Sequence, residues 1–126
     1  MKENDLSSII VNAAIEVHRT LGGPGLLESV YEEATVWEIR QRGPSVERQK
    51  EIPIVYKGFT LGHPLRLDLL VGGLVIVEVK ATSKYDPIFE SQLLTYLRLT
   101  DLKLGLVINF GERLVKDGIH RVVNSL

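Results

Sequence analysis

Charged residues interrupt two strongly apolar segments near the middle of the chain. Residues 65–80 read Leu-Arg-Leu-Asp-Leu-Leu-Val-Gly-Gly-Leu-Val-Ile-Val-Glu-Val-Lys, which places Asp68, Glu78 and Lys80 in the sequence of two buried strands. Charges in such surroundings are costly to desolvate unless they pair with one another or bind a metal ion. Two carboxylates and an amine held close on rigid strands can bind a divalent cation, activate water and neutralise a developing oxyanion. We therefore treat the chain as a candidate enzyme, with phosphodiester hydrolysis as the first reaction to test.

Strand alternation determines which of these side chains can meet. Glu78 and Lys80 point to the same face as Leu74 and Ile76, about 6–7 Å apart along the strand. A surface ion pair is the alternative interpretation, and the apolar neighbours on the same face argue against it.

The connection between the two segments decides where Asp68 points. A strict two-residue turn at Gly72-Gly73 would place Asp68 opposite Val77, and therefore on the face directed away from Glu78. The two acids can converge only if the connection has an odd length or contains a bulge. Glycines tolerate the positive φ that such a connection needs. We therefore expect a departure from the two-residue register.

The composition is that of one globular domain covering residues 1–126. Apolar residues make up 44% and charged residues 25% of the chain, which is close to the average for soluble domains. No apolar run approaches the ~20 residues of a membrane span, and the N-terminal Met-Lys-Glu-Asn-Asp-Leu lacks the layout of a signal peptide. The absence of cysteine excludes disulfides, thiolate nucleophiles and cysteine zinc sites. We expect a soluble cytoplasmic protein with no membrane partner.

The formal net charge of −1 bears on any interaction with nucleic acid. Proteins that bind nucleic acid usually carry a basic face, because phosphate contacts supply most of the non-specific affinity. Here any basic face must be local, and a bound metal ion would add positive charge at the site itself. The charge balance argues against tight duplex binding but leaves catalysis on nucleic acid open.

Hydrophobic periodicity predicts eight elements in the order ααβββαββ. The predicted helices cover about residues 4–21, 26–40 and 86–100, and the predicted strands cover about residues 46–56, 65–71, 74–80, 104–110 and 119–123. Pro53 favours an edge position or a strand start for the first strand. The nearly uniform apolar sequence 74–79 predicts a strand that is covered on both faces. The expected fold class is α/β, a central mixed β-sheet flanked by helices.

Polar residues on all three predicted helices could add to the chemistry of the sheet. Gln92 and Tyr96 lie one turn apart, where an amide and a hydroxyl can contact phosphate, metal-bound water or a carboxylate; an exposed polar stripe is the alternative. Glu28 shares a helix edge with Tyr31, and an exposed first-turn glutamate is the alternative there. His18 could be a ligand, or a hydrogen-bonded packing residue at the margin of the first helix's apolar face.

Together these residues resemble a known pattern. Asp68 followed by Glu78-Val79-Lys80 resembles the core of the PD-(D/E)xK nuclease superfamily, although Leu67 stands where the superfamily name has proline. The segment Gln92-Leu93-Leu94-Thr95-Tyr96 resembles the QxxxY element of the RecB-like branch. Residues 25–31 read GxxExxY, the signature of a family of small bacterial and archaeal proteins in this superfamily. The resemblance covers nearly the whole chain.

The resemblance implies a restriction-endonuclease-like core with a Mg²⁺ or Mn²⁺ site. It implies that Asp68 and Glu78 bind the metal ion, that the carbonyl of Val79 is a further oxygen ligand, and that Glu28 completes or supports the site. Lys80 would orient or help to deprotonate the attacking water and stabilise the transition state.

The same resemblance gives roles to the remaining helical residues. Gln92 and Tyr96 would steady the active site or the nucleic-acid backbone. His18 would be a further metal ligand, as a helix histidine is in some RecB-like exonucleases.

The expected function is metal-dependent hydrolysis of phosphodiester bonds in nucleic acid, with DNA preferred to RNA. The first alternative is a non-catalytic module on the same fold that binds nucleic acid or a protein partner. A hydrolase acting on a nucleotide or another small phosphate ester is a third reading. Because one protomer of 126 residues offers little binding surface, a homodimer is a further expectation.

Overall fold

Two helices precede the sheet and pack together against one of its faces. The computed structural model describes all 126 residues, with α1 at Glu3–Leu21 and α2 at Glu28–Gln41. The apolar residues of α1 recur at three- and four-residue spacing and are buried; they are Leu6, Ile10, Ala13, Ala14 and Val17. Gly22 ends α1 at φ 92°, a left-handed conformation that favours glycine.

Five strands form one mixed sheet in the order β1-β4-β5-β6-β7. These strands are β1 (Val46–Ile52), β4 (Leu65–Val71), β5 (Val75–Lys80), β6 (Leu104–Asn109) and β7 (Ile119–Val123). Only β5 and β6 are parallel, and the chain between them forms α3 (Ile88–Thr100). A short 3₁₀ helix, η1 (Val115–Gly118), leads into β7. The expected α/β class with a central mixed sheet is therefore confirmed.

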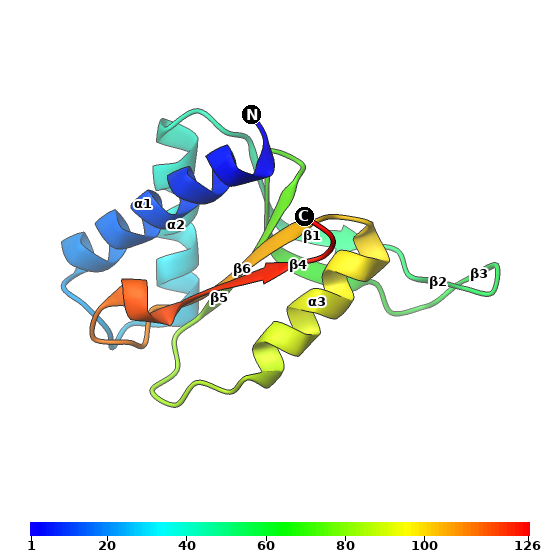
Figure 1. Cartoon of the computed structure of the whole chain (residues 1–126). Helices are drawn as coiled ribbons and strands as arrows, with labels where there is room; N and C mark the ends of the chain where they lie inside the picture. The colour runs from blue at the N-terminus through cyan, green and yellow to red at the C-terminus, as the bar shows by residue number, and fades with distance from the viewer.

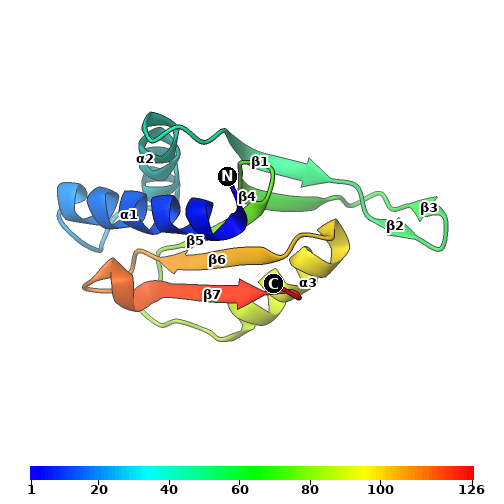
Figure 2. The same ribbon diagram turned by 45° about the horizontal axis from the view of Figure 1, so that its top comes forward.

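The sheet has a hydrophobic core on each face, as the apolar sequence of its central strands predicts. A cluster of 19 buried residues joins α1, α2 and η1 to one face of the sheet. A second cluster of 7 buried residues lies between α3 and the other face. Figures 1 and 2 show these layers, with α3 on the side of the sheet away from α1. All six residues of β6 are buried, because helices cover both of its faces.

The predicted strand at residues 46–56 is confirmed only up to Ile52, because the chain leaves the sheet at Pro53. β1 ends at Ile52, and a separate hairpin follows, formed by β2 (Val55–Tyr56) and β3 (Phe59–Thr60). Proline has no N–H group to continue a ladder, but the alternation of apolar residues runs on past it and hides the break. We call residues 53–64 the hairpin arm, and Figure 1 shows it projecting beyond the body of the protein.

Two helices begin slightly later than the periodicity predicts. Leu27 is extended (φ −67°, ψ 147°), so α2 starts at Glu28. At α3 the carboxylate of Asp86 accepts a hydrogen bond from the N–H of Ile88 at 3.0 Å, and the helix starts at Ile88.

β1 lies at the edge of the sheet, which is the position that Pro53 favours.

Candidate active site

The connection between β4 and β5 has three residues. Val71 pairs with Val75, which leaves Gly72-Gly73-Leu74 as the loop. Both glycines have positive φ, 59° and 69°, which is the conformation that such a loop requires. The expected odd-length connection is therefore confirmed, and it places the position of Asp68 opposite that of Glu78.

β4 and β5 diverge immediately beyond this point. Their pairing stops at Leu69 and Val77, although both strands continue, β4 beside β1 and β5 beside β6. Leu67 belongs to the core under α3, whereas Val79 belongs to the core under α1 and α2. We call this divergence the fork; its apex lies at Asp68 and Glu78.

At the apex of the fork, each of the two acids accepts a hydrogen bond from a backbone N–H of the opposite strand. The backbone N–H of Asp68 donates to Oε2 of Glu78 at 2.9 Å, and the N–H of Val79 donates to Oδ2 of Asp68 at 2.8 Å. These carboxylate oxygens take the place of the carbonyl acceptors that the diverging strands no longer offer. The sheet therefore holds both acids together with a defined orientation.

Burial makes Glu78 an unusual acid. Glu78 is only 6% exposed. This burial, together with the nearby charge of Asp68, raises the pKa of its carboxyl from 4.5 to about 8. The hydrogen bond from Asp68 and the charge of Lys80 act in the opposite direction. Glu78 consequently holds a proton at neutral pH unless additional positive charge reaches the site.

α2 contributes two further acids, Glu28 and Glu32, one turn apart. Glu28 is exposed at the first turn of α2, as the alternative interpretation expected, but partial desolvation still raises its pKa; the charge of Lys80 opposes this rise, and the charges of Asp68 and Glu32 add to it. Glu32 is buried, and its Oε1 lies 3.4 Å from Nε of Arg48. Glu32 was not among the predicted site residues, although its spacing of four from Glu28 was a signal in the sequence.

Gln49 connects the acids of α2 to those of the sheet. Its Nε2 donates to Oε1 of Glu32 at 2.7 Å and lies 3.5 Å from Oδ1 of Asp68. Gln49 has φ 52°, and the β1–β4 pairing skips this position, opposite Asp68. A positive φ in a non-glycine residue is strained and is often found at functional sites. No feature of the sequence marks Gln49, so it was not predicted.

Lys80 lies at the open end of the fork. Its Nζ is 4.6 Å from the centroid of the Phe89 ring, a cation–π contact between β5 and the first turn of α3. The charge of Lys80 lowers the pKa of both Glu28 and Glu78. No carboxylate forms a direct ion pair with this amine, which leaves it available to a ligand.

α3 brings the half-buried Tyr96 close enough to Asp68 and Glu78 for their charges to act on it, and the exposed Gln92 lies one turn before it. Burial raises the pKa of Tyr96, the charges of Glu78 and Asp68 raise it further, and contact with the Gln92 side chain acts in the opposite direction. Leu93 and Leu97 anchor the other side of the helix in the core. The tyrosine hydroxyl is therefore protonated at neutral pH and can donate a hydrogen bond near the fork.

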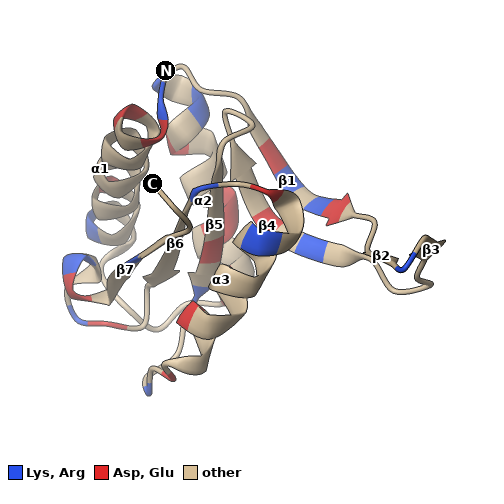
Figure 3. Cartoon of the chain, turned by 45° about the vertical axis from the view of Figure 1, so that its right-hand side comes forward, with Lys and Arg blue, Asp and Glu red and all other residues tan.

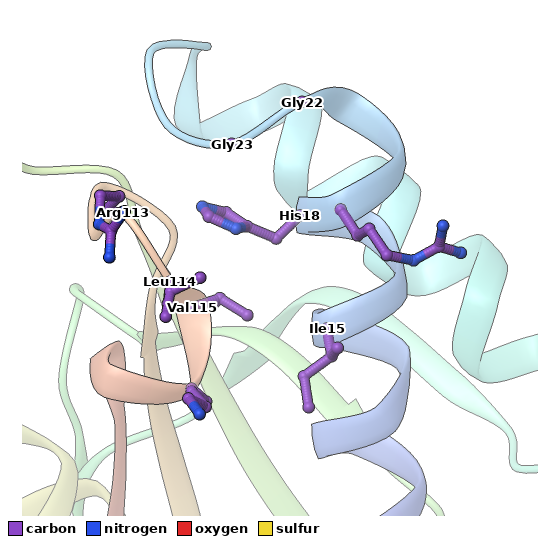
Figure 4. A pocket seen from close by; sticks show the side chains of 9 residues that line it. Ile15, His18, Gly22, Gly23, Arg113, Leu114 and Val115 are labelled. Carbon is purple, nitrogen blue, oxygen red and sulfur yellow. The ribbon is translucent and has the colours of Figure 1, made fainter.

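His18 contacts Phe110 and not the acids of the fork. Its Nε2 donates to the carbonyl oxygen of Phe110 at 3.2 Å, because a carbonyl only accepts, so of the two ring nitrogens only Nδ1 keeps a lone pair. No hydrogen bond or ion pair connects His18 to the acids. The ring lines a cavity of about 440 Å³ between α1 and the loop of Arg113, and none of the acids lines it (Figure 4). The contacts of His18 agree with the packing alternative, and its role as a metal ligand stays a prediction.

Tyr31 supports the loop that precedes Glu28. Its hydroxyl donates to the carbonyl of Gly23 at 2.6 Å and accepts from the N–H of Leu26 at 3.2 Å. Its ring stacks on Phe110, with centroids 4.7 Å apart. The tyrosine of the GxxExxY segment is thus a buried structural residue, and the glutamate of that segment is close enough to Asp68 and Lys80 for their charges to act on it.

The donors at the fork suit a hard divalent cation. The side chains of Asp68, Glu78, Glu28 and Glu32 offer only oxygen atoms, which Mg²⁺ and Mn²⁺ prefer. In this structure the carboxylates bind backbone N–H groups, and no three acids or histidines form a ready-made metal-binding group. The chemistry of the donor set fits such an ion, provided that the carboxylates reorient to receive it.

Comparison with known proteins agrees with the geometry. Residues 4–122 match the family model described as the PD-(D/E)XK nuclease superfamily. None of the curated proteins or solved structures compared with the chain matches it. None of its helices combines the length and apolar character needed to cross a bilayer. The match spans most of the 126 residues, so the chain belongs to the PD-(D/E)XK nuclease superfamily.

Proposed function

We propose that the protein is a Mg²⁺- or Mn²⁺-dependent nuclease that hydrolyses phosphodiester bonds at the fork. The observation that carries this proposal is the meeting of Asp68 and Glu78 at the apex, with Lys80 two residues further along the same strand. A scaffold that only binds has no need to bury an acid whose pKa is raised to about 8. Membership of a nuclease superfamily supports the same reaction class.

Asp68 and Glu78 would hold the metal ion, together with the carbonyl of Val79 and with Glu28. A bound divalent ion supplies a Lewis acid that polarises the phosphate and lowers the pKa of bound water. Gln49 keeps Glu32 and Asp68 in place through its amide group.

The other side chains act on the substrate. The Lys80 ammonium orients the attacking water and stabilises the charge that develops on the phosphate oxygens. Gln92 and Tyr96 donate hydrogen bonds toward the nucleic-acid backbone from α3. The motif of residues 25–31 and the QxxxY spacing of Gln92 and Tyr96 support the finer assignment to the GxxExxY proteins and the RecB-like branch.

The direct test is cleavage of labelled single- and double-stranded DNA and RNA in Mn²⁺ or Mg²⁺. We expect DNA cleavage by the wild type, and a loss on the order of 100-fold or more for Asp68→Asn and Lys80→Met. Glu47→Gln is the matched control, because Glu47 is an exposed acid of β1 paired only with Lys50. Cleavage that survives both site substitutions would show that the reaction occurs elsewhere or comes from a contaminant.

A non-catalytic module on this fold is the second candidate. The observation in its favour is that the acids of the fork already have backbone partners, Asp68 on Val79 and Glu78 on Asp68. Calorimetry with Mn²⁺ decides between the two candidates. The nuclease requires metal binding that Asp68→Asn weakens, whereas the module binds nucleic acid or protein without taking up metal.

The chain is also proposed to form a homodimer. Light scattering tests this proposal, and a molecular mass equal to that of one chain would exclude it.

A further inference from the structure

The hairpin arm presents two aromatic rings on one of its faces. Tyr56 pairs directly with Phe59 across a two-residue turn, Lys57-Gly58, in which both residues have positive φ (49° and 84°). Directly paired residues of an antiparallel ribbon point to the same face. The N–H of Leu61 donates to the carbonyl of Ile54 at 2.8 Å and extends the pairing toward the body. The rings are therefore displayed side by side on a hydrogen-bonded ribbon.

Neither ring packs into the body of the protein. Phe59 is 73% exposed and Tyr56 is 58% exposed, and neither belongs to either core. Figure 2 shows the ribbon of β2 and β3 extending beyond the sheet and the helices. Paired exposed aromatic side chains at such a position indicate an interaction surface.

The charge of the arm indicates the chemistry of its partner. Residues 53–64 contain Lys57 and His63 and no acidic residue, although the chain as a whole has a net charge of −1. Figure 3 shows the arm without acidic positions, whereas β1 and β4 carry both signs. Nζ of Lys57 lies 5.4 Å from the centroid of the Tyr56 ring, so the cation accompanies the aromatic face. A basic, aromatic ribbon complements a polyanion that offers flat rings.

The arm is also connected directly to the proposed catalytic strand. The chain returns from the arm into β4, and Asp68 follows Phe59 by nine residues, which span at most about 30 Å. A nucleic-acid strand that lies along β4 can therefore reach both the aromatic face and the acids of the fork.

We propose that the hairpin arm binds an unpaired stretch of the nucleic-acid substrate by stacking its bases on Tyr56 and Phe59, while Lys57 contacts a phosphate. This inference rests on the proposed nuclease function and adds to it a substrate class, nucleic acid with a single-stranded segment. Bases within a duplex already stack on each other, whereas unpaired bases offer free faces to aromatic side chains. The arm therefore favours single-stranded over fully paired substrate.

Binding measured in EDTA tests the arm separately from catalysis. We expect the double substitution Tyr56→Ser with Phe59→Ser to weaken binding of a labelled oligo(dT), measured by fluorescence anisotropy, by about tenfold or more. Each ring that is removed takes away the stacking contact of one base. Lys57→Gln should lower the slope of log affinity against log salt by about 1. Trp37→Ser is the matched control, since Trp37 is an aromatic residue of α2 that is 59% exposed; it should bind as the wild type does.

A reporter on the arm shows whether bases contact the rings. In a Trp37→Phe background, which removes the one native tryptophan, Phe59→Trp places a single indole on the arm. Stacking should quench its fluorescence with oligo(dT) and much less with a blunt duplex.

The proposal is overturned if the double serine variant binds oligo(dT) like the wild type, or if the wild type does not bind it at all. It is also overturned if the double variant changes a dimer into a monomer while nucleic-acid affinity is unchanged, because the arm then joins two copies of the chain. Arm-dependent binding without any cleavage supports the arm and refutes only the nuclease.

Discussion

Replacing Glu78 with glutamine should remove a large pH dependence from the stability of the metal-free protein. The folded protein holds this carboxyl at a pKa of about 8, compared with an ordinary value of 4.5. Glutamine keeps the shape of the side chain and an oxygen that can accept the N–H of Asp68, but it never ionises. The variant therefore isolates the cost of burying the charge.

The sign follows from proton binding. Between pH 4.5 and about 8 the unfolded chain has lost this proton and the folded protein still holds it. The folded state binds more protons, so the free energy of unfolding falls as the pH rises, by about 1.4 kcal/mol per pH unit for one group. Stability from this group is complete below pH 4.5 and is lost above about pH 8. Over that interval the loss amounts to roughly 3–5 kcal/mol, the lower figure allowing for relaxation of the site.

Urea unfolding in EDTA at pH 5, 6, 7, 8 and 9 measures the effect. The free-energy difference between Glu78→Gln and the wild type should grow in favour of the variant up to about pH 8 and then become constant. Glu47→Gln, which removes an exposed acid, should show no such growth. A difference that is independent of pH, or that favours the wild type increasingly at high pH, would refute the assignment of a buried, protonated Glu78.

Three further outcomes are expected. Because Glu78 must lose its proton to bind a cation, Mn²⁺ affinity should rise about tenfold per pH unit below pH 8, with release of about one proton per ion in calorimetry; an affinity that does not change between pH 6 and 8 would contradict this. Phe89→Leu should lower kcat by about three- to tenfold and leave KM nearly unchanged, because Lys80 loses the ring that holds its ammonium; equal loss in kcat and rise in KM would argue against a positioning role. Gly111→Ala should destabilise the fold by about 3 kcal/mol in chemical unfolding, because the added Cβ would lie 2.1 Å from a backbone oxygen of the loop after β5. Gly62→Ala, where nothing lies within 4 Å, should have little effect.

The acids of the sheet could be found from the sequence because they violate a strong pattern. Asp68 and Glu78 stand out in apolar strands, and Gly72-Gly73 signalled that the connection need not follow the two-residue register. Their meeting at the apex depends on that register, which the structure confirms. The sequence did not reveal the fork itself, because divergence of two strands has no local residue signature.

Other parts of the site depend on tertiary contacts. Glu32 could have been included from its helical spacing to Glu28, but a surface glutamate has the same spacing. Gln49 enters the site through a distorted backbone that the surrounding polar sequence does not mark. The helix position of His18 suits a ligand or a packing residue equally, and only a tertiary contact, the hydrogen bond to the carbonyl of Phe110, favours packing.

The hairpin arm was missed for a different reason. Periodicity reports which residues alternate, and the alternation of Ile52, Ile54 and Tyr56 is the same whether the strand stays in the sheet or leaves it. Pro53 marked the point of departure, but an edge strand tolerates the same residue.

The crossed hydrogen bonds at the apex couple ligand capture to the cohesion of the sheet. Asp68 and Glu78 each accept a backbone N–H of the diverging strands, so a carboxylate that turns toward a new partner weakens a link between β4 and β5. Occupancy and strand separation are then thermodynamically linked. The amide protons of Asp68 and Val79 therefore report on this linkage. Their rate of exchange with deuterium measures how often the two hydrogen bonds open, and the measurement needs neither substrate nor turnover.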